Sequence, residues 1–310
     1  MKKFLSILLV TVLLAGGFCV LMYPTFSNLW NEHRQELLVS SYREEAAQIS
    51  DSLYDTMLAA AEAYNAEHKN DTLPDAFAVG ELNADEVYDA LLNLNGDGLM
   101  GYVEVPCINV SLPVYHTTTS EVLAKGVGHL TGSSLPVGGE STHTILSAHR
   151  GLPSSRLFTD LDRVQIGDIF YIHTAGRTLA YEVDQIKVCE PDDVSELQIT
   201  EGMDLATLLT CTPYGVNTQR LLVRGHRVEY SEEVYQQQTE TNRAAVSRQF
   251  ILYPCIGLLV VAIGAALMLH KSKKAKTLPQ AGLPTADPAA QTDQPETEKD
   301  SADGNGGEKT

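Results

Sequence analysis

The chain has 310 residues and a formal net charge of −18 at pH 7. This length accommodates one or two domains. The acidic balance argues against nucleic acid or an anionic membrane surface as a direct partner, because both carry the same sign of charge.

Two apolar runs lie near the ends of the chain, at Phe4 to Tyr23 and at Phe250 to Leu269. Each is long enough for a helix to cross ~30 Å of hydrocarbon. Lysines precede the first run and follow the second, so the positive-inside rule predicts that both termini are cytoplasmic. The first run could instead be a cleaved signal peptide, although it exceeds a usual h-region and no Ala-x-Ala site closes it. We therefore expect a two-pass protein of the cell membrane whose central region is extracytoplasmic.

The central region changes character at about residue 99. Residues 27–68 contain neither Gly nor Pro and carry apolar residues at helical spacing, which predicts one or two helices. An exposed loop is expected at Asn70 to Gly80, followed by a short helix at Ala84 to Leu92. Seven β-like runs then predict a mainly β fold built on a closed or nearly closed barrel. These runs are Gly101–Val105, Leu112–Tyr115, Thr144–Ser147, Ile169–His173, Leu179–Ile186, Leu205–Cys211 and Leu221–Val228.

The five cysteines divide between two settings. Cys19 and Cys255 fall inside the apolar runs, which leaves Cys107, Cys189 and Cys211 in the external region. Cys107 and Cys189 both lie in β-like runs and could form a disulfide, whose geometry the sequence does not fix. An odd number of external cysteines leaves at least one free thiol. The surroundings of Cys211 indicate that it is this free thiol.

Cys211 ends one β-like run, and Arg220 begins the next. Proline, glycine and asparagine residues between them supply turn chemistry, so the two runs are expected to be adjacent strands. Such strands can present a thiol and a guanidinium to the same groove. The cation can depress the thiol pKa or hold an oxyanion, which points to acyl transfer. The pair lacks a base.

The external region offers several histidines as that base: His116, His129, His143, His149, His173 and His226. His149 is favoured because it lies where a β-like run enters a loop containing glycine and proline. Catalytic groups concentrate at such strand-end loops on a rigid scaffold. His143, at the other end of the same run, is expected to be structural.

These motifs resemble those of the sortase transpeptidases. The matching segments are Leu146–Gly151, Thr210–Thr218 and Arg220, and the flanking stretches are similar to class C, the pilin-polymerising sortases. The flanking stretches include Met100–Pro106, Leu112–His116, Gly126–Leu130, Ser134–Gly139 and Leu157–Leu161. The resemblance implies an eight-stranded β-barrel that needs no metal or organic cofactor.

The resemblance also implies the roles of the site residues. Cys211 is expected to be the nucleophile, His149 the acid and base, and Arg220 the cation that positions substrate or holds the oxyanion. The thiolate would attack the Thr–Gly bond of an LPXTG-like sorting signal, and the thioacyl enzyme would pass to a pilin lysine amine. The expected partners are LPXTG-bearing pilin or surface-protein precursors. Attachment of surface proteins to a cell-wall precursor, a catalytically idle sortase-fold scaffold and a cysteine peptidase are the alternatives.

Class C sortases carry an N-terminal lid in which an Asp-Pro-aromatic triplet covers the active cysteine. The matching triplet is Asp75, Ala76 and Phe77, in the loop expected at residues 70–80. Proline would fix φ, so the alanine predicts a looser lid. An ordinary surface loop is the alternative to a lid.

The sequence thus predicts the following plan: an anchor at 1–23, a helical segment with a lid-like loop at 24–98, a catalytic barrel at 99–232, a juxtamembrane linker at 233–249, a transmembrane helix at 250–270, and a basic stop followed by an acidic tail at 271–310. The tail is rich in Pro, Ala, Gly, Asp and Glu without aromatic residues, so it is expected to be disordered and cytoplasmic.

Overall fold

The computed structural model describes residues 2–69, 71–77 and 86–239. The chain divides into two compact units, Met1–Ile251 and Leu252–Thr310, and the second lies wholly outside the described residues. The transmembrane helix expected at 250–270 and the tail at 271–310 therefore also lie outside them.

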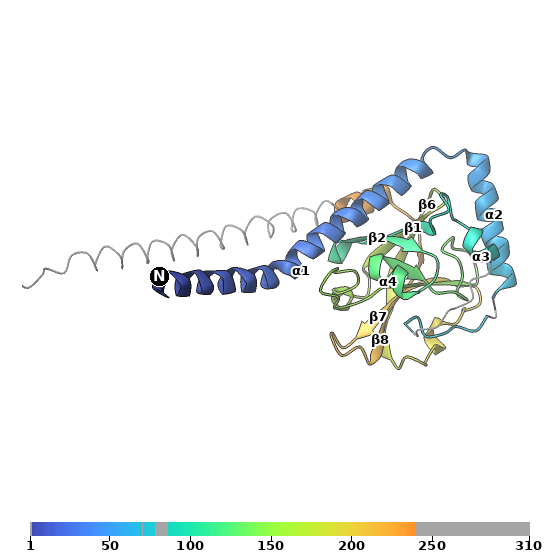
Figure 1. The fold of residues 1–310 in the computed structure, drawn as a ribbon. Coiled ribbons are helices and arrows are strands. Elements are labelled where there is room, and N and C mark those ends of the chain that lie inside the picture. The colour runs from blue at the N-terminus through green and yellow to red at the C-terminus, as the bar shows by residue number, and fades with distance from the viewer. Residues whose placement is uncertain (1, 70, 78–85, 240–310) are drawn as a thin grey trace, which may run out of the picture. The chain divides into compact units, whose positions relative to one another are not determined.

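Within the described residues, eight strands close into a barrel in the order β1-β2-β3-β4-β7-β8-β6-β5 (Figure 1). This arrangement confirms the mainly β, eight-stranded fold. Pairs β2–β3 and β4–β7 are parallel, and the remaining pairs are antiparallel. The strands are β1 (Leu99–Val105), β2 (Val110–Tyr115), β3 (Val127–His129), β4 (Thr142–Ser147), β5 (Ile169–Thr174), β6 (Arg177–Cys189), β7 (Asp204–Thr212) and β8 (Gln219–Val228).

Each of the seven predicted β-like runs is confirmed as a strand, with small differences at the ends. The sequence did not predict β3 or the short helix α4 (Ser120–Lys125) that precedes it. A strand of three residues is too short to show an alternating pattern. Three short 3-10 turns complete the domain: η1 (Pro106–Ile108), η2 (Leu161–Arg163) and η3 (Ser195–Leu197).

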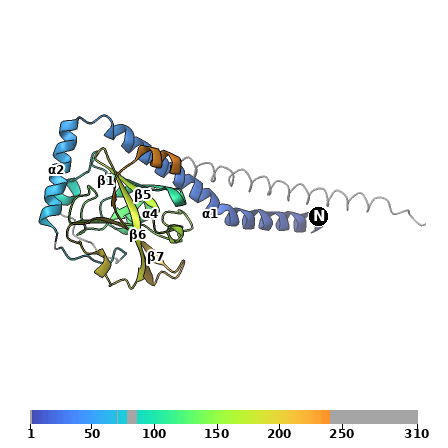
Figure 2. The same ribbon diagram turned by 180° about the vertical axis from the view of Figure 1, so that it is seen from behind.

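Helices α1 (Lys2–Ala46), α2 (Asp51–Glu67) and α3 (Glu86–Ala90) lie outside the barrel (Figures 1 and 2). The expected helices before the barrel are therefore confirmed. On α1, the Tyr42 hydroxyl donates to the Met100 carbonyl at 3.0 Å and accepts from the Ala175 amide at 3.1 Å. On α2, the Asn65 amide exchanges two hydrogen bonds with the backbone of Leu135, at 2.7 and 3.2 Å. Buried polar contacts of this kind fix the position of each helix on the barrel wall.

The structure describes the first of the two expected transmembrane segments but not the second. In the part of the chain that it describes, no helix combines the length and the apolar character needed to cross a membrane.

The loop between β4 and β5 packs its apolar residues into the barrel core. Phe158 is fully buried and Leu157 is 3% exposed, in one cluster with Phe170 and Leu208. Burying a phenylalanine side chain contributes roughly 1.5–3 kcal/mol. The Phe158 amide also donates to the His149 carbonyl at 3.1 Å. Core packing therefore holds the backbone that carries His149.

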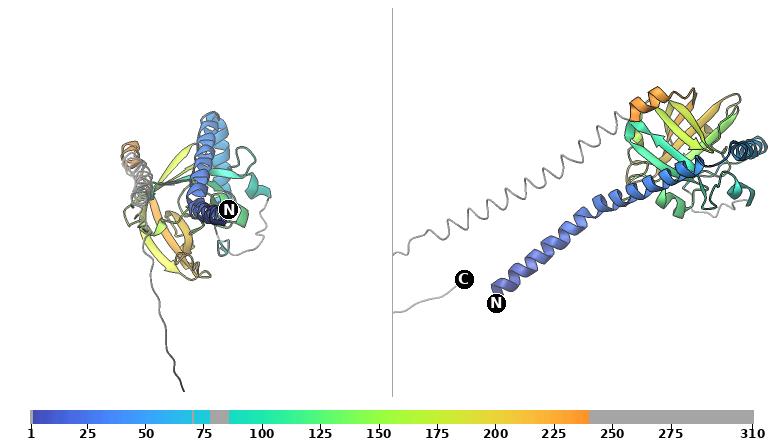
Figure 3. Two further views of the ribbon diagram at one scale, coloured as in Figure 1. Left: turned by 60° about the vertical axis from the view of Figure 1, so that its left-hand side comes forward. Right: turned by 90° about the horizontal axis from the view of Figure 1, so that it is seen from above.

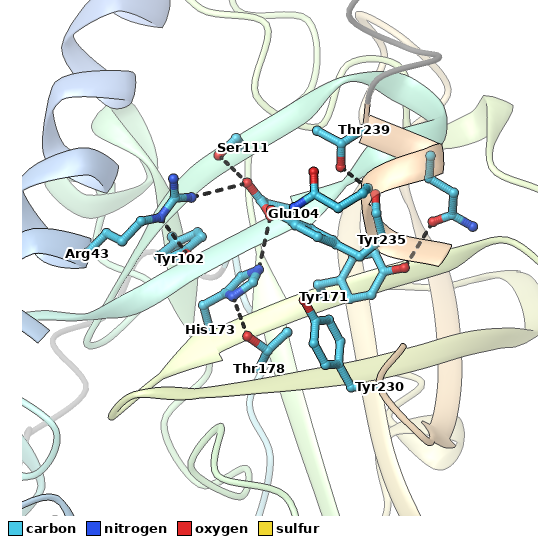
Figure 4. Close-up of polar contacts among 12 residues, drawn as sticks. Arg43, Tyr102, Glu104, Ser111, Tyr171, His173, Thr178, Tyr230, Tyr235 and Thr239 are labelled. Carbon is cyan, nitrogen blue, oxygen red and sulfur yellow. Dashed lines mark hydrogen bonds and ion pairs between the residues drawn. The ribbon is translucent and has the colours of Figure 1, made fainter. Parts of the chain in front are cut away.

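A partly buried carboxylate on β1 joins the barrel to the helical segments on either side of it. Glu104 accepts hydrogen bonds from His173 at 3.0 Å and from the Tyr235 hydroxyl at 2.7 Å, and it pairs with Arg43 of α1 at 3.7 Å (Figure 4). Tyr235 belongs to residues 232–239, which are helical (orange in Figure 3). The described part of the segment expected as a linker is thus a helix docked on the barrel.

Candidate active site

The hairpin of β7 and β8 sets a cysteine opposite an arginine. The antiparallel register pairs Cys211 with Arg220, and the β6–β8 register pairs the same arginine with Cys189. Cys211 is 6% exposed and Arg220 is 8% exposed. The thiol and the guanidinium therefore share one nearly enclosed place at the ends of the strands.

His149 reaches the same level of the sheet from the neighbouring strand. Strand β4 runs parallel to β7, with Ser147 opposite Leu209. The ladder continues past the end of β4, because the Ala148 amide donates to the Leu209 carbonyl at 3.1 Å. The Thr210 hydroxyl donates to the Ala148 carbonyl at 2.7 Å. Two residues beyond the Ser147–Leu209 pair, the register sets His149 level with Cys211.

Residues of the candidate lid contact both neighbours of the thiol. Asp75 accepts two hydrogen bonds from Arg220, at 2.8 and 2.6 Å, in the fork geometry that favours strong pairing. The Phe77 ring centroid lies 5.6 Å from that of His149 and 5.1 Å from the guanidinium carbon of Arg220. Four of the residues singled out from the sequence therefore form one contact network, and Cys211 lies opposite one of them.

The expectation of an exposed loop is wrong for residues 73–77, which are buried or partly buried. Ala76 is 1% exposed and belongs to an apolar cluster with Leu130, Ile145 and Leu209 of the barrel wall. Leu73 and Phe77 pack against the same cluster. A small apolar side chain at the centre of the triplet fits directly against the wall, which explains why this stretch does not extend into solvent.

The surroundings of the site favour the uncharged forms of the Cys211 thiol and the His149 imidazole. Burial raises the pKa of the Cys211 thiol; the charge of Arg220 lowers that pKa, and the charge of Asp75 raises it. Burial lowers the pKa of His149. Both shifts move the pair toward a neutral thiol and a neutral imidazole.

The other histidines have partners elsewhere in the fold. His143 is 1% exposed and is held by the Gln198 carbonyl and the Thr207 hydroxyl, and burial lowers its pKa to about 4. Burial likewise lowers the pKa of His129 to about 4. The polar partners of the remaining three are the Gly98 and Leu91 carbonyls for His116, Glu104 and the Thr178 hydroxyl for His173, and Asp184 for His226. The structural assignment of His143 is confirmed.

All four cysteines in the described part of the chain are free. The possible disulfide between Cys107 and Cys189 is therefore wrong. Cys107 is an exposed residue, but partial burial of its thiol and the nearby Asp168 raise its pKa to about 12, which disfavours the thiolate at neutral pH. Cys255 lies outside the described residues.

Two residues of this region were not singled out from the sequence. Thr210 binds the Ala148 carbonyl, and the Arg150 guanidinium donates to the Thr212 hydroxyl at 3.3 Å. The sequence held a signal for both, because hydroxyl residues flank Cys211 and an arginine directly follows His149. As for metals, no cluster of three or more His, Cys, Asp or Glu residues within the described ranges is arranged to hold an ion.

A closed eight-stranded barrel with a cysteine, a histidine and an arginine at the ends of adjacent strands is consistent with a cysteine acyltransferase. The family model for the Sortase domain matches residues 103–228, which contain all three residues. Sortase D of Bacillus subtilis (strain 168) is 30% identical over 131 residues, covering 41% of this chain and 63% of that protein. The chain thus matches slightly less than two thirds of the length of this curated relative.

Solved structures extend the similarity to nearly their whole length. Sortase C of Streptococcus pneumoniae is 43% identical, with a TM-score of 0.57 over 62% of this chain and 97% of that one. Sortase C1 of Streptococcus agalactiae is 45% identical, with a TM-score of 0.58 over 63% of this chain and 99% of that one. The chain belongs to the sortase family of cysteine transpeptidases, and its strong structural matches are class C sortases.

Proposed function

We propose that the protein cleaves an LPXTG-like sorting signal between Thr and Gly and transfers the acyl group to a lysine amine of a pilin. The observation that carries this proposal is the register that sets Cys211 opposite Arg220 and level with His149. The similarity to a Streptococcus pneumoniae sortase C whose structure bears on pilin substrate specificity supports the choice of substrate.

In the proposed reaction, the Cys211 thiol passes its proton to His149, its sulfur attacks the threonine carbonyl carbon, and the carbonyl oxygen gains the negative charge. Arg220 offers N–H donors to that oxygen. His149 protonates the glycine nitrogen as the C–N bond breaks, which leaves a thioester on Cys211. The lysine amine then attacks the thioester and loses its proton to His149. An isopeptide bond forms, the C–S bond breaks, and His149 returns the proton to the Cys211 sulfur, so the thiol is regenerated without any external oxidant.

We propose that Asp75 and Phe77 act as a lid over this site. Two donors of Arg220 are committed to Asp75, so these donors become available to a substrate carbonyl only when Asp75 leaves. The Phe77 ring contacts both the His149 ring and the Arg220 guanidinium, the two groups that the substrate peptide has to reach in the proposed reaction. Substrate binding and lid departure are therefore competing states of one site.

Pilus polymerisation is favoured over attachment of surface proteins to a cell-wall precursor. The lid-like segment before the barrel and the second apolar run at residues 250–269 favour it. A catalytically idle scaffold would be expected to lack one of the three chemical groups, and this sequence retains Cys211, His149 and Arg220.

We propose that the catalytic barrel is extracytoplasmic and that residues 4–23 and 250–269 attach the protein to the cell membrane, with both termini in the cytoplasm. The support is the apolar composition of these runs and the lysines that flank them. Protease added outside intact cells should digest the barrel and leave a tag at either terminus protected. Digestion of either tag would contradict the two-pass arrangement.

The test of activity uses the full-length protein, a sorting-signal peptide and a pilin subunit. A ladder of isopeptide-linked pilins that disappears in Cys211→Ala and in His149→Ala is expected. Peptide hydrolysis without a ladder would indicate a cysteine peptidase instead. Transfer to a cell-wall precursor amine, with no pilin ladder, would support the anchoring alternative.

A further inference from the structure

Residues on both sides of His149 in the chain form hydrogen bonds with residues close to Cys211 in the chain. Before His149, Ala148 is tied to β7 by the Leu209 carbonyl and by the Thr210 hydroxyl. After His149, Arg150 donates to the hydroxyl of Thr212 at 3.3 Å. The first tie is an extension of the sheet ladder. The second depends on a single long side chain.

Arg150 is placed to join the loop that follows β4 to the end of β7. Its side chain is 8% exposed, and its guanidinium donates to Asp162 of η2 at 2.5 Å as well as to Thr212. Its guanidinium carbon lies 5.9 Å from the ring centroid of Tyr214, which follows Thr212 in the chain by two residues. The Tyr214 ring also covers Gly151, where an added Cβ would lie 3.3 Å from it. One guanidinium thus contacts η2, in the loop that carries His149, and the segment after Cys211.

We propose that Arg150 is a positioning residue that holds the His149 imidazole in register with the Cys211 thiol. The Asp162 carboxylate pairs with the guanidinium on one side, and the Thr212 hydroxyl accepts a hydrogen bond from it on the other. This inference rests on the proposed function, because it assigns Arg150 a role only through His149 and Cys211. Arg150 itself takes no part in bond making or proton transfer.

Stability alone does not account for this arrangement. The Arg150 Nε is buried without a hydrogen-bond partner in the described structure. An unpaired buried donor is costly, so this guanidinium stabilises the fold less than a fully bonded one would. Its remaining donors nevertheless bridge two segments that differ widely in sequence position. A side chain that spans the two halves of a reacting pair sets their geometry, and a displacement of ~1 Å can cost ~100-fold in rate.

The test compares matched substitutions in the full-length protein. Arg150→Met keeps a long side chain and removes every donor, and Thr212→Val removes the acceptor on β7 while leaving the ion pair with Asp162. Arg156→Met is the control. Arg156 lies on the same loop and, like Arg150, pairs with an aspartate of that loop, in its case Asp160. Unlike Arg150, it makes no hydrogen bond or ion pair with β7 in the described part of the chain.

Arg150→Met is expected to lower kcat by roughly 10- to 100-fold with less than a threefold change in KM, because geometry of the reacting groups is lost and not peptide binding. Thr212→Val should lower kcat by about threefold to tenfold, and the two changes together should be less than additive. Arg156→Met should retain wild-type kcat. The pH profile of Cys211 alkylation in Arg150→Met should move toward that of His149→Ala, a change that simple destabilisation does not produce.

The outcomes separate this inference from the proposed function. If Cys211→Ala and His149→Ala both retain turnover, the proposed function fails. If both abolish turnover while Arg150→Met and Thr212→Val keep wild-type kcat and alkylation profiles, the Arg150 inference alone is overturned. The same holds if the loss in Arg150→Met disappears well below its Tm, since the role is then structural. If Arg150→Met does not fold, Thr212→Val and Arg150→Lys decide, and wild-type kcat in both overturns the inference.

Discussion

Arg220 donates two hydrogen bonds to Asp75, at 2.8 and 2.6 Å, across a long separation in sequence. The cation that faces the candidate nucleophile is therefore already paired with a carboxylate of the N-terminal segment. In the proposed lid, the state of this one pair sets both the charge near Cys211 and the access of substrate to it. Predictions about reactivity follow from this relationship.

Asp75→Asn should make the Cys211 thiol more reactive at neutral pH. The Asp75 charge raises the pKa of Cys211 and Arg220 lowers it, so neutralising the carboxylate lowers that pKa on balance. The thiolate fraction at pH 7 then rises, and the alkylation rate should increase by roughly threefold to tenfold. Asp184→Asn is a matched control, because Asp184 pairs in the same forked way with Arg224 on β8. An equal effect of both changes would refute the local explanation.

Phe77→Ala should raise the pKa of His149 toward the ordinary value of the imidazole. Burial lowers that pKa, and the Phe77 ring, 5.6 Å away between centroids, provides part of the burial. A pH titration of the His149 ring signals by NMR measures the shift directly. A more basic imidazole remains protonated to higher pH. The descending limb of the pH–rate profile should therefore move to higher pH for any step that requires the imidazolium. A pKa that stays at the wild-type value would show that Phe77 does not shield the ring.

Arg220→Ala should lower kcat more than it weakens peptide binding. If the guanidinium stabilises charge on the carbonyl oxygen only in the transition state, kcat and kcat/KM should fall together by about 100- to 1000-fold. Arg224→Ala, four residues along the same strand and paired with Asp184, should change kcat by less than about twofold. A rise in KM with unchanged kcat would instead assign Arg220 to ground-state binding.

Glu104→Gln should destabilise the fold in a pH-dependent way. Burial by itself would raise the pKa of Glu104, but His173, Tyr235 and Arg43 outweigh it and lower the pKa overall. The folded pKa lies below the unfolded one, so the stabilisation is complete above the unfolded pKa and is lost as pH falls through the folded value. Urea unfolding at pH 7 should show a loss of about 1–3 kcal/mol, and the loss should shrink at lower pH. A difference independent of pH would contradict the assignment to the Glu104 carboxylate.

Much of the candidate site could be predicted from local sequence. The turn residues between two β-like runs were enough to set Cys211 near Arg220, because a tight connection makes its strands neighbours. The position of His149 at a strand end was equally visible. Its alignment with Cys211 was not, since it depends on the parallel pairing of β4 with β7, which are distant in sequence.

Contacts carried by small or single side chains escaped prediction for a physical reason. Ala76 in a loop gives no periodic signal, yet it is 1% exposed because the barrel wall offers an apolar surface of the right size. The same is true of β3, whose few residues pair only because β2 and β4 lie on either side. Long-range packing decides these features, and no short window of sequence contains it.

The contact between Tyr235 and Glu104 also determines how mechanical load would enter the domain. In the closed order of strands, β1 and β7 are separated by four steps in either direction around the barrel. A pull on the chain beyond residue 239 meets the hydrogen bond between Gln238 and Tyr171 on β5 before the one between Tyr235 and Glu104 on β1. These side-chain contacts pass part of the tension to β5 and β1, while the backbone continues directly into β8, which ends at Val228 and pairs with the strand of Cys211. The hairpin that holds the thiol is therefore shielded from tension only while the contacts of Gln238 and Tyr235 hold.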